Sequence, residues 1–199
     1  MRKNALQLVF FLLICLWMSL SAAQERTTIL VSYYSQQGHT RTMAEAVARG
    51  AGSVAGVTVK LLDVEKTVKE DLLGADAIIV GSPVHNGNVA TEVVRFIDRW
   101  PFEGGPLRDK IGAAFVTGGG ISAGEELAQL NILHSMVIFG MIVVGGPDWT
   151  TAFGASAITA EPPFDKTATG TSIAPEFVKK GEALGKRVAE LAMKWKRSR

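Results

Sequence analysis

The sequence predicts a single α/β domain built on a doubly wound sheet of five parallel strands, with helices on both faces. Short apolar, β-rich runs alternate with longer helical patterns along most of the chain, which indicates successive strand–helix–strand units and therefore parallel strands. Three of the runs are continuously apolar, as expected of strands covered on both faces. The 199 residues are 47% hydrophobic and 20% charged, a composition that fits one globular domain with a sizeable core.

Each strand is predicted from its own pattern. The first runs over Thr28–Tyr34 ("TILVSYY"), and a helix over Thr42–Ser53 follows it. The second strand, Val57–Leu62, alternates apolar and other residues and is expected at an edge of the sheet. The buried strands are the continuous runs Ala75–Val80, Ile111–Thr117 and Met141–Val144. The other helices are predicted around Thr91–Arg99, Gly124–Phe139 and Pro175–Lys196.

One long connection separates the last predicted strand from the last helix. It runs over Asp148–Ala174 and is rich in Ser, Thr and Gly, with two consecutive prolines. Connections of this length inside a compact domain are usually functional loops or mobile segments.

The first 23 residues have the pattern of a secretory signal peptide. Arg2 and Lys3 precede the apolar run Ala5–Leu20, and Ser21-Ala22-Ala23 supplies the small residues needed for cleavage. We therefore expect residues 1–23 to be a signal peptide and residues 24–199 to form the exported domain, periplasmic or secreted. The alternative is an uncleaved membrane anchor, because the apolar run is almost long enough to span a bilayer. Cys15 is the only cysteine, so the processed chain would form no disulfide.

Charge argues against nucleic acid as a partner. Without Arg2 and Lys3, the 21 basic residues become 19, which equals the 19 acidic ones. The expected domain is thus near neutral and lacks an overall basic character. Its C-terminal helix ends in basic residues, which suit the helix dipole; contact with an anionic membrane surface is the alternative, so membrane proximity is possible.

Ligands of doubly wound sheets bind beyond the carboxyl ends of the strands, and the turn after the first strand is suited to a phosphate. This turn is "SQQGHT", Ser35–Thr40, directly before a helix. The backbone N–H groups of residues 37–40 can converge there, with the hydroxyls of Ser35 and Thr40 as further donors. The turn lacks the P-loop and dinucleotide fingerprints. The alternative is a plain turn in which Thr40 caps the helix.

Two more loops follow strands at the same edge of the sheet. In "GSPVHNGNV", Pro83 fixes the exit from the strand and Gly87 permits a tight bend, so that backbone groups can face a flat polar ring. In "TGGG", Thr117–Gly120, three glycines permit close approach to a ligand. The alternatives are a structural turn and a flexible loop.

Together, "YYSQQGHTRTMA", "GSPVHNGNV" and "TGGG" resemble the flavodoxin-like fold family, specifically the WrbA-type NAD(P)H:quinone oxidoreductases and related NADPH-dependent FMN reductase-like flavoproteins. The resemblance covers about Thr27 to Lys194 and implies the strand order 2-1-3-4-5. It implies FMN as cofactor and NAD(P)H as co-substrate. The phosphate would be bound by Ser35, Gln37, Gly38, His39 and Thr40. The isoalloxazine would be wrapped by Pro83, Val84, His85, Asn86, Gly87, Asn88 and Val89. Its other edge and the ribityl chain would be lined by Thr117, Gly118, Gly119 and Gly120.

The chain departs from this family at two places. Ile138 and Phe139 precede Gly140-Met141, where a histidine pair is usual, and His134 lies a helical turn earlier. The aromatic residue that a neighbouring subunit places over the flavin has no clear match, although Trp100 or Phe102 could serve. The three histidines lack metal-ligand spacing, and no metal is expected.

The resemblance implies an oxidoreductase in which the flavin carries the chemistry. A hydride would pass from NAD(P)H to flavin N5, and two electrons would then pass to a quinone or a similar small acceptor in a ping-pong mechanism. No catalytic residue is required of the chain. The alternatives are a flavodoxin-type electron carrier that serves protein partners, and a module whose flavin site has decayed. The family also suggests homo-dimers or homo-tetramers.

Overall fold

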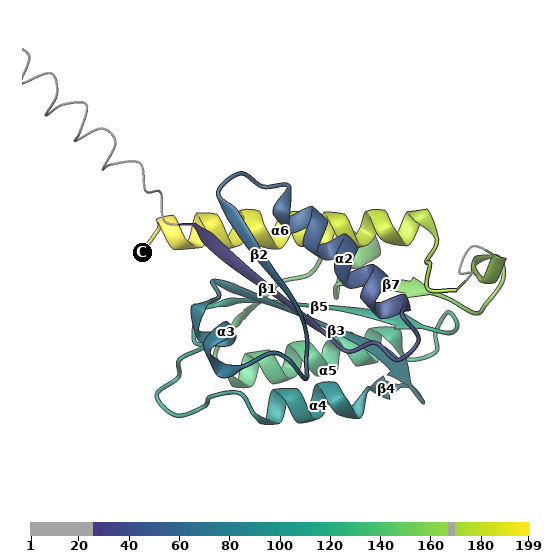
Figure 1. The fold of residues 1–199 in the computed structure, drawn as a ribbon, viewed down its shortest axis with the longest axis horizontal. Coiled ribbons are helices and arrows are strands. Elements are labelled where there is room, and N and C mark those ends of the chain that lie inside the picture. The colour runs from purple at the N-terminus through teal and green to yellow at the C-terminus, as the bar shows by residue number, and fades with distance from the viewer. Residues whose placement is uncertain (1–25, 167–169) are drawn as a thin grey trace, which may run out of the picture.

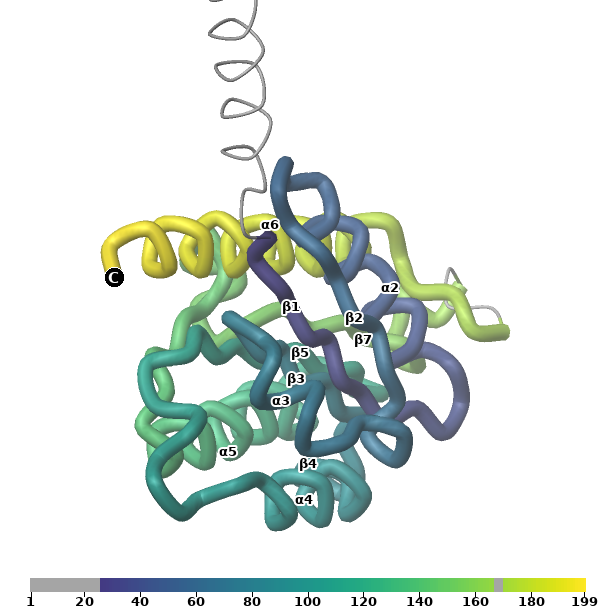
Figure 2. Tube along the Cα trace, turned by 60° about the vertical axis from the view of Figure 1, so that its left-hand side comes forward, coloured from purple at the N-terminus to yellow at the C-terminus, as the bar shows by residue number. Residues whose placement is uncertain are grey.

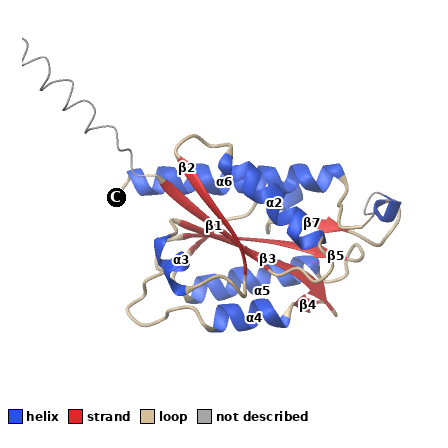
Figure 3. Cartoon of the chain, in the orientation of Figure 1, coloured by secondary structure: helices blue, strands red, loops and turns tan. Residues whose placement is uncertain are grey.

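A mainly parallel sheet forms the middle layer of the molecule, between two layers of helices (Figures 1 and 3). The computed structural model describes residues 26–166 and 170–199, so the signal peptide predicted at residues 1–23 lies outside them. The strands are β1 (Thr27–Tyr33), β2 (Val57–Asp63), β3 (Ala77–His85), β4 (Asn88–Val89), β5 (Ile111–Gly118), β6 (Ile142–Val143) and β7 (Ala155–Ile158). Their order is β2-β1-β3-β5-β6, which confirms the order 2-1-3-4-5 of the five predicted strands.

The fifth position of the sheet differs from the prediction, because two short strands share it. β6 pairs with Ile111 and Gly112 of β5, whereas β7 pairs with Phe115–Gly118. A turn of 3₁₀ helix, Trp149–Thr151, lies between them. β7 therefore falls inside the connection that the sequence predicts to be a loop. Its residues, "ASAI", are mostly small and give little of the β-branched signal that marks a strand.

The helices cover both faces of the sheet. α2 (His39–Gly52) and α6 (Pro175–Arg197) lie on one face, and α3 (Lys69–Gly74), α4 (Thr91–Asp98) and α5 (Glu125–Ile138) lie on the other (Figure 1). Each face has its own apolar core. One contains Ile29, Ile79 and Phe115 with Met43, Val47, Leu184 and Val188. The other contains Leu30, Ile78 and Val116 with Leu72, Val93, Phe96, Ile132 and Met136. The six-residue α3 has no counterpart among the predicted elements.

Helices α2 and α6 touch through glycines. A Cβ on Gly185 would lie 1.9 Å from the carbonyl oxygen of Val47, and a Cβ on Gly50 would lie 1.9 Å from that of Glu182. Gly181 faces Met43 in the same way, at 2.7 Å from its sulfur atom. At Gly185 and Gly50 the clash would be with backbone atoms, so only glycine fits these two positions and the two helix backbones pack directly against each other.

The parallel arrangement gives the molecule two distinct ends. β1 begins beside α6, which runs antiparallel to the strands (Figure 2). Near the end of α6, the Lys196 Nζ donates to the carbonyl oxygen of Arg26 at 3.2 Å and to Asp76 Oδ2 at 3.1 Å. The three predicted loops lie at the opposite end of the molecule. The turn at Ser35–Gly38 follows β1, but residues 81–85 belong to β3 and Thr117 and Gly118 belong to β5, because both strands run further than the sequence predicts. Across residues 26–166 and 170–199, no helix combines the length and apolarity needed to cross a bilayer.

Candidate functional site

A pocket of about 260 Å³ lies at the carboxyl ends of β1, β3, β5 and β7. It brings together residues from all three predicted loops. The predicted residues that line it are Gln37, His39, Thr40, Pro83, Val84, His85, Thr117, Gly118 and Gly119. It is also lined by Gln36, Thr159 and Ala160, which the sequence analysis did not select. The remaining predicted residues, Ser35, Gly38, Asn86–Val89 and Gly120, do not line this pocket, and Asn88 and Val89 line a separate one between α4 and α5.

Ser35 organises the turn after β1. Its Oγ accepts hydrogen bonds from the backbone N–H groups of Gly38 and Arg41, both at 3.1 Å. Gly38 has a φ of 98°, a conformation that favours glycine. Among the described residues, the backbone N–H groups of Gln37, His39 and Thr40 form no hydrogen bond. The turn therefore presents three free N–H groups at the positive end of the α2 dipole, an arrangement that suits an anion. The N–H of Gly38, which the sequence analysis included among these donors, is occupied by Ser35.

A segment before α6 packs against the outside of this turn. His39 Nδ1 donates to the carbonyl oxygen of Ser172 at 2.9 Å, and Thr42 Oγ1 donates to that of Thr171 at 2.7 Å. A Cβ on Gly38 would lie 2.3 Å from Thr171 Cγ2. His39 is thus tethered through its Nδ1 side, and its ring packs the loop before α6 against the turn.

A buried hydroxyl pair joins the first loop to the third. The Oγ1 atoms of Thr40 and Thr117 lie 2.7 Å apart, and these residues are 2% and 5% exposed. This bond holds the start of α2 against the end of β5. Thr40 does not cap α2, because its hydroxyl bonds across the sheet and the residue before the helix is Gly38.

The loop after β3 is a two-residue β-hairpin. Val84 pairs with Val89 and His85 with Asn88, while Asn86 and Gly87 form the turn with φ angles of 50° and 78°. Positive φ at both positions is typical of the hairpin turn that Asn-Gly favours. The sequence analysis predicted the bend at Gly87 but not the strand pairing. The tip of the hairpin rests on α5, since a Cβ on Gly124 would lie 2.6 Å from Gly87 Cα.

The glycine-rich loop after β5 is paired with residues that follow β7. The Thr159 and Ala160 N–H groups donate to the carbonyl oxygens of Gly118 and Gly119, both at 3.0 Å. The Ile121 N–H donates to a carboxylate oxygen of Glu161 at 2.6 Å. Thr159 and Ala160 reach the pocket because β7 extends the sheet beside β5. The only signal for them in the sequence is the short run before them, "ASAI".

Polar aromatic groups flank the pocket beside the hairpin. The rings of Tyr34 and His85 meet edge to face at 6.4 Å. Burial, and secondarily the negative charge and hydrogen bond of Glu92, raises the pKa of the Tyr34 phenol, which stays neutral at physiological pH. At the start of α5, the Glu125 carboxylate accepts from the N–H groups of Ser122 and Ala123 at 2.8 and 2.9 Å.

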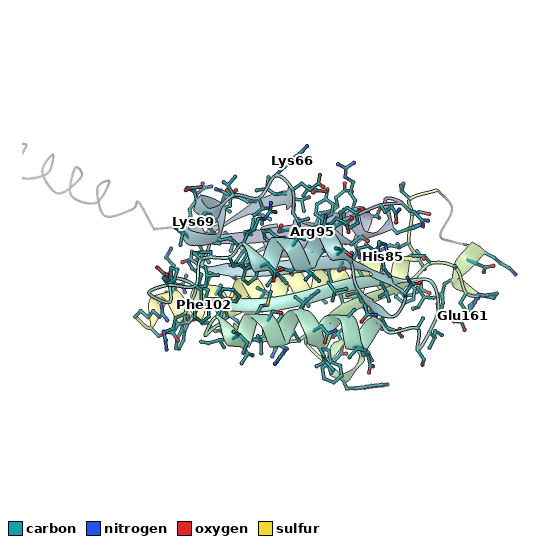
Figure 4. All side chains as sticks on the ribbon, turned by 90° about the horizontal axis from the view of Figure 1, so that it is seen from below. Lys66, Lys69, His85, Arg95, Phe102 and Glu161 are labelled. Carbon is teal, nitrogen blue, oxygen red and sulfur yellow. The ribbon has the colours of Figure 1, made fainter. Side chains whose placement is uncertain are left out.

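The structure corrects the expectation for the aromatic residue over the pocket. Trp100 is 4% exposed and packs between Phe96 and Phe139, so it cannot reach another subunit. Phe102 is exposed but lies at the opposite end of the molecule from His85 and Glu161 (Figure 4). His134 is an exposed residue of α5. In the part of the chain that is described, no cluster of His, Cys, Asp and Glu could hold a metal ion.

A family model described as NADPH-dependent FMN reductase matches residues 26–156, more than half of the chain. A flavodoxin of Aquifex aeolicus is 38% identical over 144 residues, which cover 67% of this chain and 75% of that protein. An NAD(P)H dehydrogenase (quinone) of Azorhizobium caulinodans is 36% identical over 143 residues, which cover 60% of this chain and 70% of that protein.

Solved structures show the same fold. A flavodoxin, WrbA-like protein from Agrobacterium tumefaciens superposes with a TM-score of 0.69 at 24% identity, covering 84% of this chain and 98% of that one. A flavodoxin from the domain Archaea superposes with a TM-score of 0.63 at 26% identity, covering 84% of this chain and 99% of that one.

Proposed function

Because this chain belongs to the NADPH-dependent FMN reductase family, we propose that it binds FMN in the pocket and transfers electrons from NAD(P)H to a quinone or a similar small acceptor. The observation that carries the proposal is the convergence of three loops on one pocket. The turn after β1, the β3–β4 hairpin and the glycine-rich loop after β5 all contribute to its lining.

The residues present fit this cofactor. The free N–H groups of Gln37, His39 and Thr40 would hold the phosphate, with the positive end of α2 behind them. The hairpin residues Pro83–His85 would lie along the ring system, and Thr117–Gly119 would line its other side and the ribityl chain. Convergent backbone N–H groups at a helix N-terminus form a recurring phosphate-binding arrangement in proteins.

The bound flavin would supply the redox chemistry, accepting a hydride at N5 and passing electrons onward. The tasks of the protein are then to hold and to shield the cofactor. Rigid contacts serve both tasks: Ser35 fixes the turn, the Thr40–Thr117 pair joins two loops, and the Gly87–Gly124 contact holds the hairpin. One open pocket receiving NAD(P)H and acceptor in turn is compatible with a ping-pong mechanism.

Absorbance spectroscopy tests the proposal. The purified protein is incubated with excess FMN, desalted, and mixed anaerobically with NADH or NADPH. We expect retained flavin absorbance, bleaching by the nicotinamide and recovery on addition of benzoquinone. Steady-state rates at several quinone concentrations should give parallel double-reciprocal lines. A protein that retains no flavin would contradict the assignment of the pocket.

A flavodoxin-type electron carrier is the second candidate, favoured by the 38% identity to the Aquifex aeolicus flavodoxin. The acidic groups beside the pocket, Glu92, Glu125 and Glu161, also suit a carrier that docks on basic protein partners. Retained flavin that neither NADH nor NADPH bleaches would identify the carrier.

We further infer that two copies of the chain associate through α5. Its outer face carries four exposed apolar residues at helical spacing, Leu127, Leu130, Val137 and Ile138, which are 41% to 60% exposed. Glu126 lies at one end of this stripe and Arg108 near the other, beside Gly140. An antiparallel pairing of two α5 helices would cover both stripes and bring each Glu126 toward the Arg108 of the other copy.

A further inference from the structure

The end of the molecule opposite the pocket carries a basic cluster drawn from two elements. Arg26 precedes β1, and four basic residues close the chain on and after the last turns of α6. We call this set the basic end; it consists of Arg26, Lys194, Lys196, Arg197 and Arg199. The contact of the Lys196 ammonium group with the carbonyl oxygen of Arg26, at 3.2 Å, places both parts of the set together.

Positive charge exceeds negative charge at this end. Asp76 pairs with Lys196 at 3.1 Å, and Asp109 pairs with Arg199 at 3.0 Å. Glu190 lies one turn before Lys194 on α6. Among the described residues, the side chains of Arg26, Lys194 and Arg197 form no ion pair or hydrogen bond, and all three are exposed. The helix dipole accounts for basic residues in the last turn of α6, but it does not account for Arg26, which belongs to another element.

An amphipathic aromatic residue lies among these charges. Trp195 is 38% exposed, and its indole N–H donates to the carbonyl oxygen of Asp109 at 2.8 Å. The Arg199 guanidinium lies 4.9 Å from the centre of the Trp195 ring. Exposed tryptophan beside lysine and arginine is the composition that proteins place at the headgroup level of a membrane.

The apolar run predicted from the sequence, Ala5–Leu20, precedes Arg26 closely in the chain. Five residues separate Leu20 from Arg26. Retained in the membrane as an uncleaved anchor, this run would bring Arg26, and with it the end of α6, close to lipid headgroups. Anionic headgroups are the complementary surface for a tethered polybasic cluster.

We propose that the basic end docks the domain on an anionic lipid bilayer. The exposed charges of Arg26, Lys194 and Arg197 provide the attraction, and Trp195 enters the headgroup layer. Docking leaves the pocket open to water, because it lies at the other end of the seven-residue strand β1, about 23 Å away. The proposal is independent of the chemistry in the pocket.

A fluorescent probe at the basic end tests this proposal on the full chain. Cys15 is replaced by serine and Ser198 by cysteine, which carries an environment-sensitive dye. The protein is mixed with vesicles of phosphatidylcholine alone or with phosphatidylglycerol added. We expect the dye emission to shift to shorter wavelength only with phosphatidylglycerol, and the shift to disappear in high salt.

Two matched charge variants distinguish docking through the basic end from attraction of the whole protein's charge to the vesicles. K194E/R197E should abolish the shift, whereas K66E/K179E, which reverses two exposed lysines away from the basic end, should retain it. Circular dichroism checks that both variants are folded. No shift on anionic vesicles, an equal shift on neutral vesicles, or a shift that survives in K194E/R197E would each overturn the proposal.

Discussion

Ser35 organises the turn after β1 through a single oxygen atom, which accepts two backbone N–H groups. Removing the hydroxyl frees both donors and loosens the turn that orients the three free N–H groups. We expect Ser35→Ala to weaken FMN binding by about tenfold, which corresponds to about 1.4 kcal/mol.

Fluorescence titration with FMN measures this effect. Ser53→Ala is the matched control, since its hydroxyl bonds the carbonyl oxygen of Gly50 far from the pocket. An unchanged FMN affinity in Ser35→Ala would show that the turn does not hold the phosphate.

Asp71 stabilises α3 at the cost of acid sensitivity. Its carboxylate pairs with Lys60 at 2.8 Å and accepts a hydrogen bond from the Val68 N–H at 3.1 Å. Both hydrogen bonds lower the pKa of Asp71 below its ordinary value of 3.8, and the one from Lys60 has the larger effect. Because folding lowers the pKa of Asp71, its carboxylate stabilises the folded chain at any pH above its unfolded-state pKa. This stabilisation is lost as the pH falls through the folded-state pKa. Asp71→Asn should therefore be less stable by about 1 kcal/mol at neutral pH and no different below the lowered pKa.

Urea denaturation from pH 7 to pH 3 measures the difference. Glu70→Gln, a neighbouring exposed residue of α3, should change stability by less than about 0.5 kcal/mol at neutral pH. If the Asp71→Asn difference persisted unchanged in acid, it would not arise from the charge.

At the scale of elements, the contact between α2 and α6 depends on glycine. Gly185→Ala would push a methyl group into the Val47 carbonyl oxygen, a backbone atom that cannot rotate away. We expect a loss of about 2 kcal/mol or more in the free energy of unfolding. Gly74→Ala, where a Cβ meets nothing within 4 Å, should be neutral or slightly stabilising. Thermal unfolding of the two variants makes the comparison, and equal losses would contradict it.

The stripe on α5 gives a second prediction at this scale. Leu130→Glu places a charge in the middle of the proposed interface and should convert dimers into monomers without unfolding the chain. Light scattering coupled to size-exclusion chromatography measures the mass. Leu73→Glu, at an exposed leucine of α3, should leave the mass unchanged. A monomeric wild-type protein would contradict the inference directly.

The elements that the sequence predicts well are those with a strong period or a continuous apolar run. β1, β3 and β5 are buried on both faces, and α6 has a long apolar face, so their patterns are clear. The short elements α3, β4 and β7 form because neighbours hold them, and such tertiary support leaves little trace in the local sequence. β4 does leave a trace in the sequence, because Asn86-Gly87 is a typical hairpin turn. The sequence analysis predicted only a bend there.

The pocket shows the same division. The residues at the carboxyl ends of β1, β3 and β5 were predictable, because these ends of parallel strands meet at one edge of the sheet. Thr159 and Ala160 were not, since their position depends on β7 replacing the end of the fifth strand.

At the scale of the whole molecule, ligand binding should stabilise the fold. The pocket joins α2, β3, β5 and the segment after β7, so a ligand there binds only the folded chain. FMN at a hundred times its dissociation constant should raise the free energy of unfolding by about 2.7 kcal/mol, which raises Tm by several degrees. Riboflavin, which lacks the phosphate, should give a smaller shift at the same concentration. Equal shifts for the two would show that the turn after β1 contributes nothing.

The near-zero net charge conceals an uneven distribution. Carboxylates flank the pocket, whereas the basic end lies at the other end of the strands. The fold separates the charges in space, so the overall net charge does not describe the local potential at either end of the molecule.

The division of the fifth strand between β6 and β7 also limits self-association. A long, straight outer strand offers a row of unpaired N–H and C=O groups on which another chain can add. Here that row is broken into pieces of two and four residues, with the Trp149–Thr151 turn between them. On the opposite border, β2 carries the exposed Lys60. Both borders therefore resist growth into intermolecular β-structure, a protection that matters most while a chain is newly folded and concentrated.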